Sequence, residues 1–494
     1  MALAVSISSI ITISPVIAME MFIDGKATVS GTGSRFNVIN PATGEVIDTA
    51  PSGDADDVRK AVESATHAFN RWSSMTSRDR GKILFRAAQI TRTHTADLAT
   101  LLTIEQGKPF KEARDEVQGF ANVLEYYAGI SASMRMGLVP IAHERYGAVL
   151  RRPIGVCGAV IPWNVPVLLM SWKVGPALVS GNTLVLKPAS SAPLTCLRLA
   201  GIMKEAGLPD GVLNVVTGRG DIVGEEIARN PGIRKVSFTG KTSTGKHILG
   251  LASESLKRVT LELGGSDPMI VCDDANLKAA VDGAVRGRFY NCGQTCTAVK
   301  RLFVFESIAD EYLRELIARI AALKVGNGMV EGVDLGPLNN RKQLQRIASA
   351  VETVRAKGEG KIILGGEAPK GEPYSRGFFY LPTLVTDVAR DSILMREEVF
   401  GPVLPVIIVK DLDEAIDRAN DTVYGLGSSI WTRSIERATI AGERLQSGIT
   451  WVNQHTKVPP ELPFGGVKDS GLGRENGMEA IDQYTEIKSM MINP

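Results

Sequence analysis

Two residues in the middle of this 494-residue chain have side chains suited to covalent catalysis. Cys296 lies in a turn bounded by Gly293, and Glu262 lies upstream in the segment Leu261-Glu262-Leu263-Gly264-Gly265. A cysteine in such a turn can expose its sulfur, and backbone N–H groups can hold it as a thiolate. A lone cysteine is more often a small buried apolar residue, so the interpretation depends on the surrounding sequence. The pair indicates a thiol nucleophile with a carboxylate as its candidate base.

The elements that would position these residues follow an alternating pattern. Between residues 148 and 265, short β-branched segments alternate with segments of helical periodicity, which predicts an α/β fold with a doubly wound parallel sheet. Such sheets bind ligands at the carboxyl ends of their strands. A second alternating region, from about 267 to 452, predicts a second α/β domain with the site in the cleft between the two. The predicted strands are 154–161, 183–186, 212–216, 235–238 and 258–263, and the predicted helices are 167–178, 194–206, 223–228 and 245–252.

Composition excludes several classes of partner. The chain has 56 Lys and Arg against 54 Asp and Glu, without a block of like charge, so it offers no electrostatic footprint for nucleic acid or an anionic membrane. A small-molecule substrate is expected instead. Five cysteines are an odd, sparse set, which favours free thiols in a reducing compartment and a cytoplasmic protein. We expect no metal site, because no histidine lies near Cys292 and Cys296 in sequence.

Residues 1–20 form an apolar, serine-rich N-terminal extension. Its hydropathy is similar to that of a signal peptide, but no basic residue precedes Lys26, and Pro15-Val16-Ile17-Ala18 is a poor cleavage site. An upstream extension from a misplaced start is the alternative, because the segment from Met19 to Gly25 already predicts a first strand and a turn. Elsewhere, no stretch of the sequence is long and apolar enough to span a bilayer.

Two glycine patterns follow predicted strands. Gly218-Arg219-Gly220, with Gly224 beyond it, is similar to a dinucleotide fingerprint, although no acidic residue stands where the ribose partner is usual. The segment Phe238-Thr239-Gly240-Lys241-Thr242-Ser243-Thr244-Gly245 ends a strand and opens a helix with hydroxyl and N–H groups. That arrangement suits a pyrophosphate, and a plain Gly-Ser/Thr helix cap would have much the same sequence.

Taken together, the chain resembles the aldehyde dehydrogenase superfamily from about residue 22 to 492. Seven segments occur in the family's order and spacing: Pro162-Trp163-Asn164, Leu186-Lys187-Pro188, Phe238-Thr239-Gly240, Leu261-Glu262-Leu263-Gly264-Gly265, Gly293-Gln294-Thr295-Cys296, Glu397-Glu398-Val399-Phe400-Gly401-Pro402 and Pro463-Phe464-Gly465-Gly466. The resemblance implies an NAD(P)-binding domain (21–137 and 153–265), a catalytic domain (266–470) and a small β arm (138–152 and 478–494). Through the arm, subunits would pair as a homodimer or homotetramer.

The resemblance also implies roles in aldehyde oxidation. Cys296 would attack the aldehyde, and Asn164 would stabilise the resulting oxyanion together with the cysteine's own N–H. Glu262 resembles the general base that activates water to hydrolyse the thioester. Lys173 and Glu475 resemble a proton relay, for which a solvated ion pair is the alternative.

A further group of residues matches the family's nicotinamide site. Glu398 matches the acid that binds the nicotinamide ribose, and Phe400 matches the aromatic residue beside the ring. The other residues expected to bind the cofactor are Ile161, Pro162, Trp163, Lys187, Ser190, Gly220, Gly224, Phe238, Thr239, Gly240, Lys241, Thr244 and Leu263.

The choice between NAD and NADP depends on the residues near the adenosine ribose. Ser190 stands where strictly NAD-preferring relatives often carry a glutamate, which would repel a 2′-phosphate. Because Ser190 beside Lys187 can bind that phosphate, we expect NADP to be accepted. The alternative is that Ser190 caps the helix beginning near Pro193. Lys241 stands where the family usually has a serine. Its ammonium group either contacts the pyrophosphate or points into the solvent.

The sequence defines the aldehyde only loosely. Val165, Leu169 and Trp172 share one helical face after Asn164, which predicts a substrate tunnel or ordinary core. The tunnel would be completed by Thr295, Thr297, Val458 and Phe464. No arginine flanks Cys296 closer than Arg301, which argues against a dicarboxylic semialdehyde, although Lys457 is a cation in the same region. Aliphatic, aromatic and small hydroxylated aldehydes stay open.

Three other functions compete with hydrolytic oxidation. An acylating enzyme would transfer the acyl group to coenzyme A, but members of that branch generally lack a base at the position of Glu262. A thiol esterase would use Cys296 with His455 as its base and no nucleotide. A non-catalytic protein with the same fold would not need Cys296, Glu262 and Asn164 to be present together.

Overall fold

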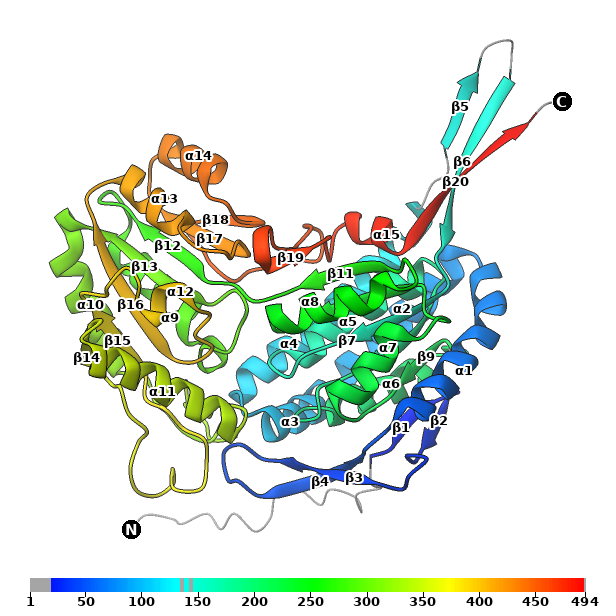
Figure 1. Cartoon of the computed structure of the whole chain (residues 1–494), viewed down its shortest axis with the longest axis horizontal. Helices are drawn as coiled ribbons and strands as arrows, with labels where there is room; N and C mark the ends of the chain where they lie inside the picture. Colours follow the sequence, from blue (N-terminus) through cyan, green and yellow to red (C-terminus); the bar gives the residue numbers. More distant parts are fainter. Residues whose placement is uncertain (1–18, 134–136, 142–144, 493–494) are drawn as a thin grey trace.

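The computed structural model describes residues 19–133, 137–141 and 145–492. Two large sheets with helices on their faces form the body, and two small sheets flank it (Figure 1). Within these residues, no helix has the length and hydrophobicity needed to cross a membrane. The predicted mixed α/β fold is confirmed.

The first large sheet has eight strands, with a parallel group in its centre. The order is β19 (Gly471–Leu472), β11 (Arg258–Glu262), β10 (Lys235–Thr239), β7 (Val156–Val160), β8 (Thr183–Lys187), β9 (Leu213–Val215), β1 (Met21–Ile23) and β2 (Lys26–Thr28). From β7 the chain proceeds outward through β8 and β9, then returns to add β10 and β11 on the other side. The connections therefore diverge between β7 and β10, and a doubly wound sheet binds ligands at such a point.

Alternate side chains of the central strands pack into two separate cores. In β7, Cys157 and Ala159 belong to one buried cluster, while Val156 and Val160 belong to another. Since both faces are covered by helices, every residue of β7 is buried and the strand reads as a continuous apolar run. Gly158 permits this packing, because a Cβ there would lie 2.4 Å from Cγ2 of Ile227.

Helices cover both faces of this sheet (Figure 1). Residues of α1, α7 and α8 contribute to one core, and residues of α2 to α6 contribute to the other. The helices are α1 (Ala55–Ser74), α2 (Ser77–Thr93), α3 (Thr95–Gln106), α4 (Phe110–Ile130), α5 (Pro166–Val179), α6 (Leu194–Glu205), α7 (Glu225–Arg229) and α8 (Thr242–Ser253). A short π-helix, Gly220–Gly224, precedes α7.

The second large sheet has seven strands and is parallel except for β14 at one edge. Its order is β14 (Lys361–Leu364), β15 (Thr383–Thr386), β16 (Val403–Val409), β13 (Val299–Phe305), β12 (Asp267–Val271), β17 (Gly427–Trp431) and β18 (Ile449–Val452). The remaining helices are α9 (Leu277–Phe289), α10 (Ala309–Ala321), α11 (Arg341–Lys357), α12 (Ile393–Arg396), α13 (Leu412–Asn420), α14 (Ile435–Arg444) and α15 (Glu479–Gln483).

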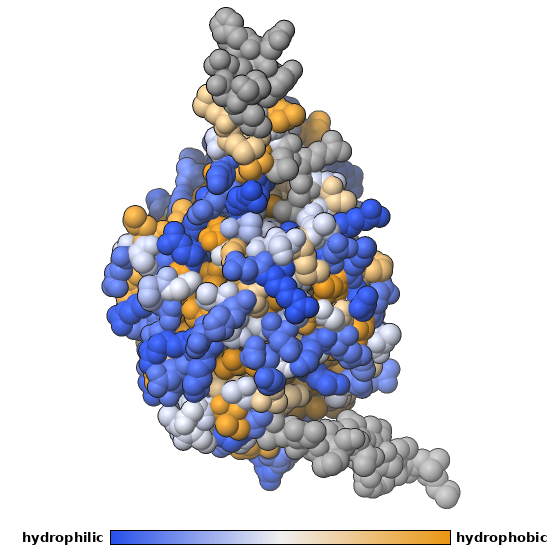
Figure 2. All heavy atoms as spheres, turned by 90° about the vertical axis from the view of Figure 1, so that its right-hand side faces the viewer, coloured by the Kyte–Doolittle hydropathy of each residue, from blue (hydrophilic) through white to orange (hydrophobic). Residues whose placement is uncertain are grey.

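Two small sheets lie outside these layers. The hairpin of β3 (Arg35–Ile39) and β4 (Val46–Pro51) lies along one side of the body (Figure 1). The second sheet joins β5 (Gly137–Ile141), β6 (Arg145–Pro153) and the C-terminal β20 (Thr485–Ile492) in an arm that projects from the body. Several apolar side chains of the arm are exposed, and Figure 2 shows hydrophobic residues near its tip. They are Leu138, Val139, Ile141, Ile487, Met490 and Met491.

The strands and helices predicted between residues 148 and 265 all occur, with ends that differ by a few residues. The first predicted strand and turn also occur, as β1 followed by Asp24 and Gly25 with positive φ angles of 53° and 69°. Residues 1–18 of the predicted N-terminal extension lie outside the described residues.

Asn182 joins three parts of the fold that are distant in sequence. Its Nδ2 donates to the carbonyl oxygens of Ala177 at 3.3 Å and Tyr484 at 2.8 Å, and its Oδ1 accepts from the N–H of Gly155 at 3.0 Å. The residue is completely buried. Asn182 therefore ties the start of β7 and the end of α5 to the segment that leads into β20.

We expect Asn182→Ala to lower the midpoint of thermal unfolding and to reduce the free energy of unfolding by about 2–3 kcal/mol. The substitution leaves buried backbone groups without partners, and each such group costs about 1–3 kcal/mol. Asn70→Ala, at an exposed position on α1, is the control and should change the midpoint little. Equal midpoints for the two variants would contradict the role given to Asn182.

Candidate active site

A cleft of ≈ 840 Å³ opens beside the point where the connections of the first sheet diverge. It lies between loops of the two large sheets and the start of α11. Eleven of the residues predicted for the site line it: Pro162, Trp163, Asn164, Leu169, Thr239, Gly240, Lys241, Leu263, Cys296, Glu398 and Phe400. The sequence reasoning missed other lining residues, among them Lys246, Lys342, Gln343 and Arg346.

Cys296 is held in the cleft by an unusual turn. After α9 ends, Asn291, Cys292 and Gly293 have φ angles of 50°, 55° and 72°, so the chain reverses sharply. A side chain at 293 has no room, because its Cβ would lie 2.3 Å from the carbonyl oxygen of Gly401. Gln294 braces the turn by donating to Asn291 O at 3.0 Å and accepting from the N–H of Asn339 at 2.9 Å.

Cys296 is the most exposed of the five cysteines, all of which the structure describes. Cys157, Cys196, Cys272 and Cys292 are buried, whereas Cys296 is partly exposed. Burial in the cleft nevertheless raises the pKa of its thiol to about 12, and Lys300 opposes this rise. The thiol is therefore neutral at rest, and a base must take its proton before it can attack.

Asn164 lies in the connection between β7 and α5. Its backbone carbonyl accepts from Lys108 Nζ at 2.8 Å and from Asn291 Nδ2 at 2.7 Å. Its side-chain amide makes no hydrogen bond within the described part of the chain and lines the cleft. This amide is thus a free donor on a backbone that is fixed from two sides.

The support behind Asn164 includes a buried ion pair that sequence reasoning missed. Lys108 pairs with Glu116, and both side chains are fully buried. Glu116 Oε1 also accepts from the N–H groups of Val167 at 2.8 Å and Leu168 at 3.2 Å, in the first turn of α5. A carboxylate at a helix N-terminus satisfies unpaired N–H groups and interacts favourably with the helix dipole. No local pattern reveals this pair, because it acts on residues about fifty positions away.

Glu262 ends β11 and is buried at 3 % exposure. Neither of its carboxyl oxygens has a hydrogen-bond partner among the residues described. Burial raises the pKa of Glu262 well above its usual value, and Glu475 adds to the rise, while Lys173 and Arg474 oppose it. Glu262 also raises the pKa of the Cys296 thiol, so the two groups interact electrostatically.

Lys173 and Glu475 form a buried ion pair with a 2.5 Å separation of Nζ and Oε1. The side chains are 0 % and 1 % exposed, so a solvated surface pair is excluded. The hydroxyl of Ser237 donates to the same oxygen at 2.9 Å. Because Glu475 and Lys173 both shift the pKa of Glu262, the pair belongs to the electrostatic surroundings of that acid.

One side of the cleft has the features of a dinucleotide site. The Thr239 hydroxyl is buried and has no partner among the described residues. Gly264 leaves room for Glu398, since a Cβ at 264 would lie 2.4 Å from Glu398 Oε2, and Glu398 accepts from the N–H of Gly265 at 3.1 Å. Phe400 packs edge-on against Trp163 with 5.6 Å between ring centroids. Orphaned donors, a glycine turn and aromatic faces fit a nicotinamide dinucleotide.

Other residues predicted for the cofactor lie behind or beside the cleft. Ile161 and Phe238 are buried, Thr244 is exposed on α8, and Gly220 belongs to the π-helix. A Cβ at Gly224 would lie 3.8 Å from Lys187, so these two residues are neighbours. Burial lowers the pKa of Lys187 to about 8, and its Nζ donates to Pro188 O at 2.9 Å.

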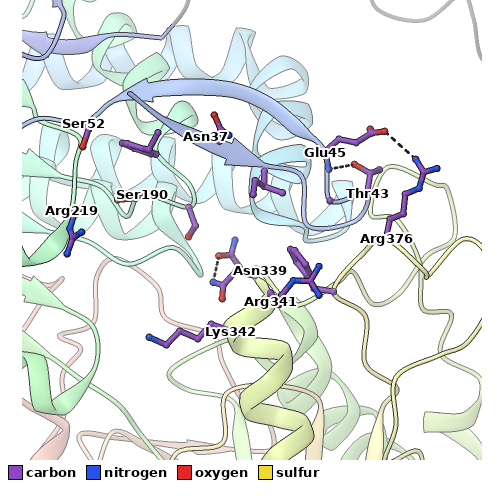
Figure 3. Close-up of a pocket in the computed structure, with 16 residues that line it drawn as sticks. Asn37, Thr43, Glu45, Ser52, Ser190, Arg219, Asn339, Arg341, Lys342 and Arg376 are labelled. Carbon is purple, nitrogen blue, oxygen red and sulfur yellow. Dashed lines mark hydrogen bonds and ion pairs between the residues drawn. The ribbon is translucent and has the colours of Figure 1, made fainter. Parts of the chain in front are cut away.

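Ser190 faces a second hollow of ≈ 910 Å³ between the β3–β4 hairpin and the start of α11 (Figure 3). Its hydroxyl donates to Gly218 O at 2.8 Å. The alternative that Ser190 caps α6 is wrong, because Glu105 accepts from the N–H groups of Leu194 at 2.8 Å and Thr195 at 2.9 Å. Arg219 and Lys342 also line this hollow, and Lys342 lines the cleft as well.

The residues predicted for the substrate gather on the α5 side of Cys296. Leu169, Trp172 and Phe464 are buried in one cluster, and Val165, Val458 and Cys296 pack against its edge. Trp172 and Phe464 lie 5.2 Å apart between ring centroids. Thr295 and Thr297 are buried, and Lys457 is exposed.

His455 does not have the geometry of a base for Cys296. Its Nδ1 hydrogen-bonds Ser429 Oγ and its Nε2 hydrogen-bonds Thr297 O, both at 2.8 Å. Burial lowers its pKa to about 4. Both ring nitrogens are occupied, which removes the main support for the thiol esterase.

Comparisons with known proteins agree with this fold. Residues 28–490 match the profile described as the aldehyde dehydrogenase family. DhaS of Bacillus subtilis (strain 168), provisionally named an aldehyde dehydrogenase, is 39 % identical over 478 residues, which cover 96 % of this chain and 95 % of DhaS. The chain therefore belongs to the aldehyde dehydrogenase family and is an oxidoreductase that acts on aldehydes with NAD or NADP.

Two solved structures show how far this similarity extends in three dimensions. An NADP-dependent enzyme of E. coli matches with a TM-score of 0.94 and 37 % identity, over 97 % of this chain and 98 % of the other. PnpE, known from Pseudomonas sp. WBC-3 and solved in complex with nicotinamide adenine dinucleotide, matches with a TM-score of 0.94 and 37 % identity. The alignment with PnpE covers 96 % of this chain and 97 % of PnpE.

The buried state of Glu262 predicts a specific dependence of stability on pH. Its pKa is raised in the folded protein, so above its unfolded pKa of about 4.5 the unfolded chain releases a proton that the folded chain retains. Wild-type stability should therefore fall as pH rises, by up to about 1.4 kcal/mol per pH unit until the folded pKa is reached. Glu262→Gln removes this loss, so its thermal midpoint should exceed that of the wild type increasingly from pH 5 to pH 8.

The control is Glu63→Gln, at an exposed position on α1. Its midpoint should track that of the wild type across the same range. If the midpoint of Glu262→Gln differed from the wild type by a constant amount at every pH, the raised pKa would be refuted.

Proposed function

We propose that this chain oxidises an aldehyde to a carboxylic acid through a covalent adduct on Cys296, which water then hydrolyses. The observation that carries the proposal is the shared cleft: Cys296 and Asn164 both line it, and Glu262 is close enough to raise the thiol's pKa. A bare aldehyde is a poor hydride donor, so a nucleophile must first make the carbonyl carbon tetrahedral. Each of the three residues has a separate part in that sequence.

In the first step, the Cys296 sulfur attacks the aldehyde carbon and its proton passes to a base. The free amide of Asn164 and the N–H of Cys296 donate to the oxygen that becomes an anion. Preorganisation of the Asn164 amide comes from Lys108 and Asn291, which fix its backbone carbonyl. Thr239, Glu398 and Phe400 would hold a nicotinamide dinucleotide, which would supply the acceptor for the hydride that leaves the carbon. The acyl group then stays on Cys296 as a thioester.

In the second step, Glu262 takes a proton from a water that attacks the thioester. A carboxyl group without partners in a buried position has its pKa moved toward the range where a general base works. The Lys173–Glu475 pair lies in its surroundings and provides a route for the proton to leave. Water, rather than coenzyme A, is therefore the proposed acyl acceptor, because an acylating enzyme needs no base at this position.

We further propose that NADP is accepted as well as NAD. Ser190 contributes no carboxylate to its hollow, and the exposed cations Arg219 and Lys342 line the same space (Figure 3). A 2′-phosphate carries up to two negative charges and binds cationic side chains and hydroxyl donors. Among the relatives, PnpE binds NAD and the E. coli enzyme is NADP dependent, which is consistent with use of either cofactor within this fold.

The substrate class, the oligomeric state and the cellular compartment are proposed from the apolar cluster beside Cys296, the exposed residues of the arm and the free cysteines. The apolar cluster beside Cys296 favours an uncharged aliphatic or aromatic aldehyde. Exposed apolar residues on both β5 and β20 support pairing of subunits through the arm, as a homodimer or homotetramer. Five free cysteines support a reducing compartment, the cytoplasm.

The two-step mechanism predicts different defects for two variants. Cys296→Ala should reduce aldehyde-dependent formation of reduced cofactor about 10³-fold or more, because no covalent adduct forms. Glu262→Gln should still give a rapid burst close to one reduced cofactor per site, followed by steady turnover reduced about 10²-fold or more. Stopped-flow absorbance of the reduced cofactor distinguishes burst from steady state.

Cys272→Ala, at a buried position beyond β12, is the matched control and should keep wild-type kinetics. Full steady-state turnover by Glu262→Gln without coenzyme A would refute the role of Glu262 as the base.

Cofactor choice is tested by placing a carboxylate beside the hollow. Ser190→Glu should lower kcat/KM for NADP about 30-fold or more and leave NAD largely unaffected, since like charges a few Å apart near a surface repel by about 2–4 kcal/mol. Arg219→Ala should also weaken NADP selectively. Wild-type enzyme that uses NADP about a hundredfold less efficiently than NAD would show that Ser190 does not provide 2′-phosphate tolerance.

A further inference from the structure

Lys300 is a buried cation beneath the catalytic turn, at 2 % exposure on β13. Its Nζ donates to the carbonyl oxygens of Cys296 at 2.6 Å and Thr295 at 3.1 Å. The same Nζ lies 3.5 Å from Glu398 Oε1 and 5.8 Å from the centroid of the Phe400 ring. One ammonium group thus contacts both the thiol-bearing turn and the segment that faces the nicotinamide side of the cleft.

We propose that Lys300 is a positioning residue that holds the Cys296 turn against Glu398 and places a positive charge against the backbone of that turn. The proposal rests on the proposed role of Cys296 as nucleophile. The hydrogen bonds to Thr295 O and Cys296 O fix the orientation of the turn. The contact with Glu398 fixes the distance between the turn and the cofactor side of the cleft. The ammonium has three N–H donors for these three oxygens, whereas a side-chain amide has two.

The segment that carries Glu398 is independently anchored, which makes it a firm support for Lys300. Arg288, completely buried on α9, donates from Nη2 to Val399 O at 3.0 Å and also to Gly401 O. Its Nη1 donates to Val299 O at 3.3 Å, one residue before Lys300. The positions of β13 and the 399–401 segment are therefore coupled before Lys300 bridges them.

The charged groups that face the thiol are mostly acidic. Asp267 on β12, Glu398 and Glu262 on β11 all raise the pKa of Cys296, and Lys300 lowers it. Lys300 also lowers the pKa of buried Asp267, which burial raises to about 7. Behind Glu262 lie Glu475, which raises its pKa, and Lys173 and Arg474, which lower it. Removing the Lys300 charge should thus disfavour the thiolate.

The test measures alkylation of Cys296 by iodoacetamide between pH 7 and pH 10, followed by mass spectrometry, with Cys296→Ala as background. Lys300→Met should slow the reaction about threefold at each pH in this range, which shifts the whole profile to higher pH, since a unit rise in thiol pKa lowers the thiolate fraction tenfold while the greater nucleophilicity of the more basic thiolate compensates in part. Lys300→Gln retains a donor without charge and should show the same shift. Lys300→Arg retains the charge and should stay close to the wild-type profile.

Lys257→Met is the matched control for the loss of a buried lysine. Lys257 Nζ also donates to two backbone carbonyls, Asn230 O at 2.6 Å and Ile233 O at 2.7 Å, but it precedes β11 at the end of that strand opposite to Glu262. It should lower the thermal midpoint without changing the alkylation profile. Lys300→Gln and Lys300→Met profiles that superimpose on the wild type would overturn the proposal, as would a Lys300→Arg profile shifted as far as that of Lys300→Gln.

The result is separable from the proposed function. A wild-type protein that oxidises no aldehyde, yet shows the shifted alkylation profile in Lys300→Gln, would refute the oxidation mechanism and support the role of Lys300. Normal aldehyde oxidation together with unshifted alkylation profiles would support the oxidation mechanism and refute the role of Lys300.

Discussion

The backbone carbonyl of Asn164 is the point on which the geometry of the site depends. It accepts hydrogen bonds from Lys108, in the loop before α4, and from Asn291, in the turn before Cys296. Three connections from different parts of the chain are therefore held at one oxygen atom. Because the side-chain amide of Asn164 takes no part in this junction, it stays available to a ligand while its position relative to Cys296 is maintained.

Buried charge is the second constraint, and it is concentrated around the cleft. The ion pairs Lys108–Glu116 and Lys173–Glu475 are almost completely shielded from water, while Glu262 has no close partner. Breaking a buried pair is strongly destabilising, so such pairs hold their surroundings in one arrangement. The site thus combines acids that are paired with a lysine and acids without a hydrogen-bond partner among the described residues, and the candidate base Glu262 belongs to the second group.

Much of the first sheet could be predicted from sequence, because its strands are continuous apolar runs and its helices have one apolar stripe. The place of a residue at the cleft could be predicted where a family motif carries it: Cys296 and Asn164 line the cleft, and Glu262 is close enough to raise the pKa of the thiol. Support that acts over long distances could not be predicted. Lys300 and Arg288 read as ordinary cations in sequence, and only the fold brings them beneath the catalytic turn. The alternatives in which His455 acts as a base and Ser190 caps α6 fail for the same reason, since the partners of His455 and of the α6 N-terminus come from distant segments.

The course of the chain after the second sheet has a structural consequence. Beyond β18, the backbone returns to the first sheet, pairs β19 with β11 beside Glu262, delivers Glu475 to Lys173, and then leaves through α15 into the arm as β20. The segment from Gly471 to Ile492 thus runs continuously from the strand beside Glu262 to an edge strand of the arm. Shortening this segment, or fusing a bulky tag to its end, would disturb the interior of the enzyme as well as the arm.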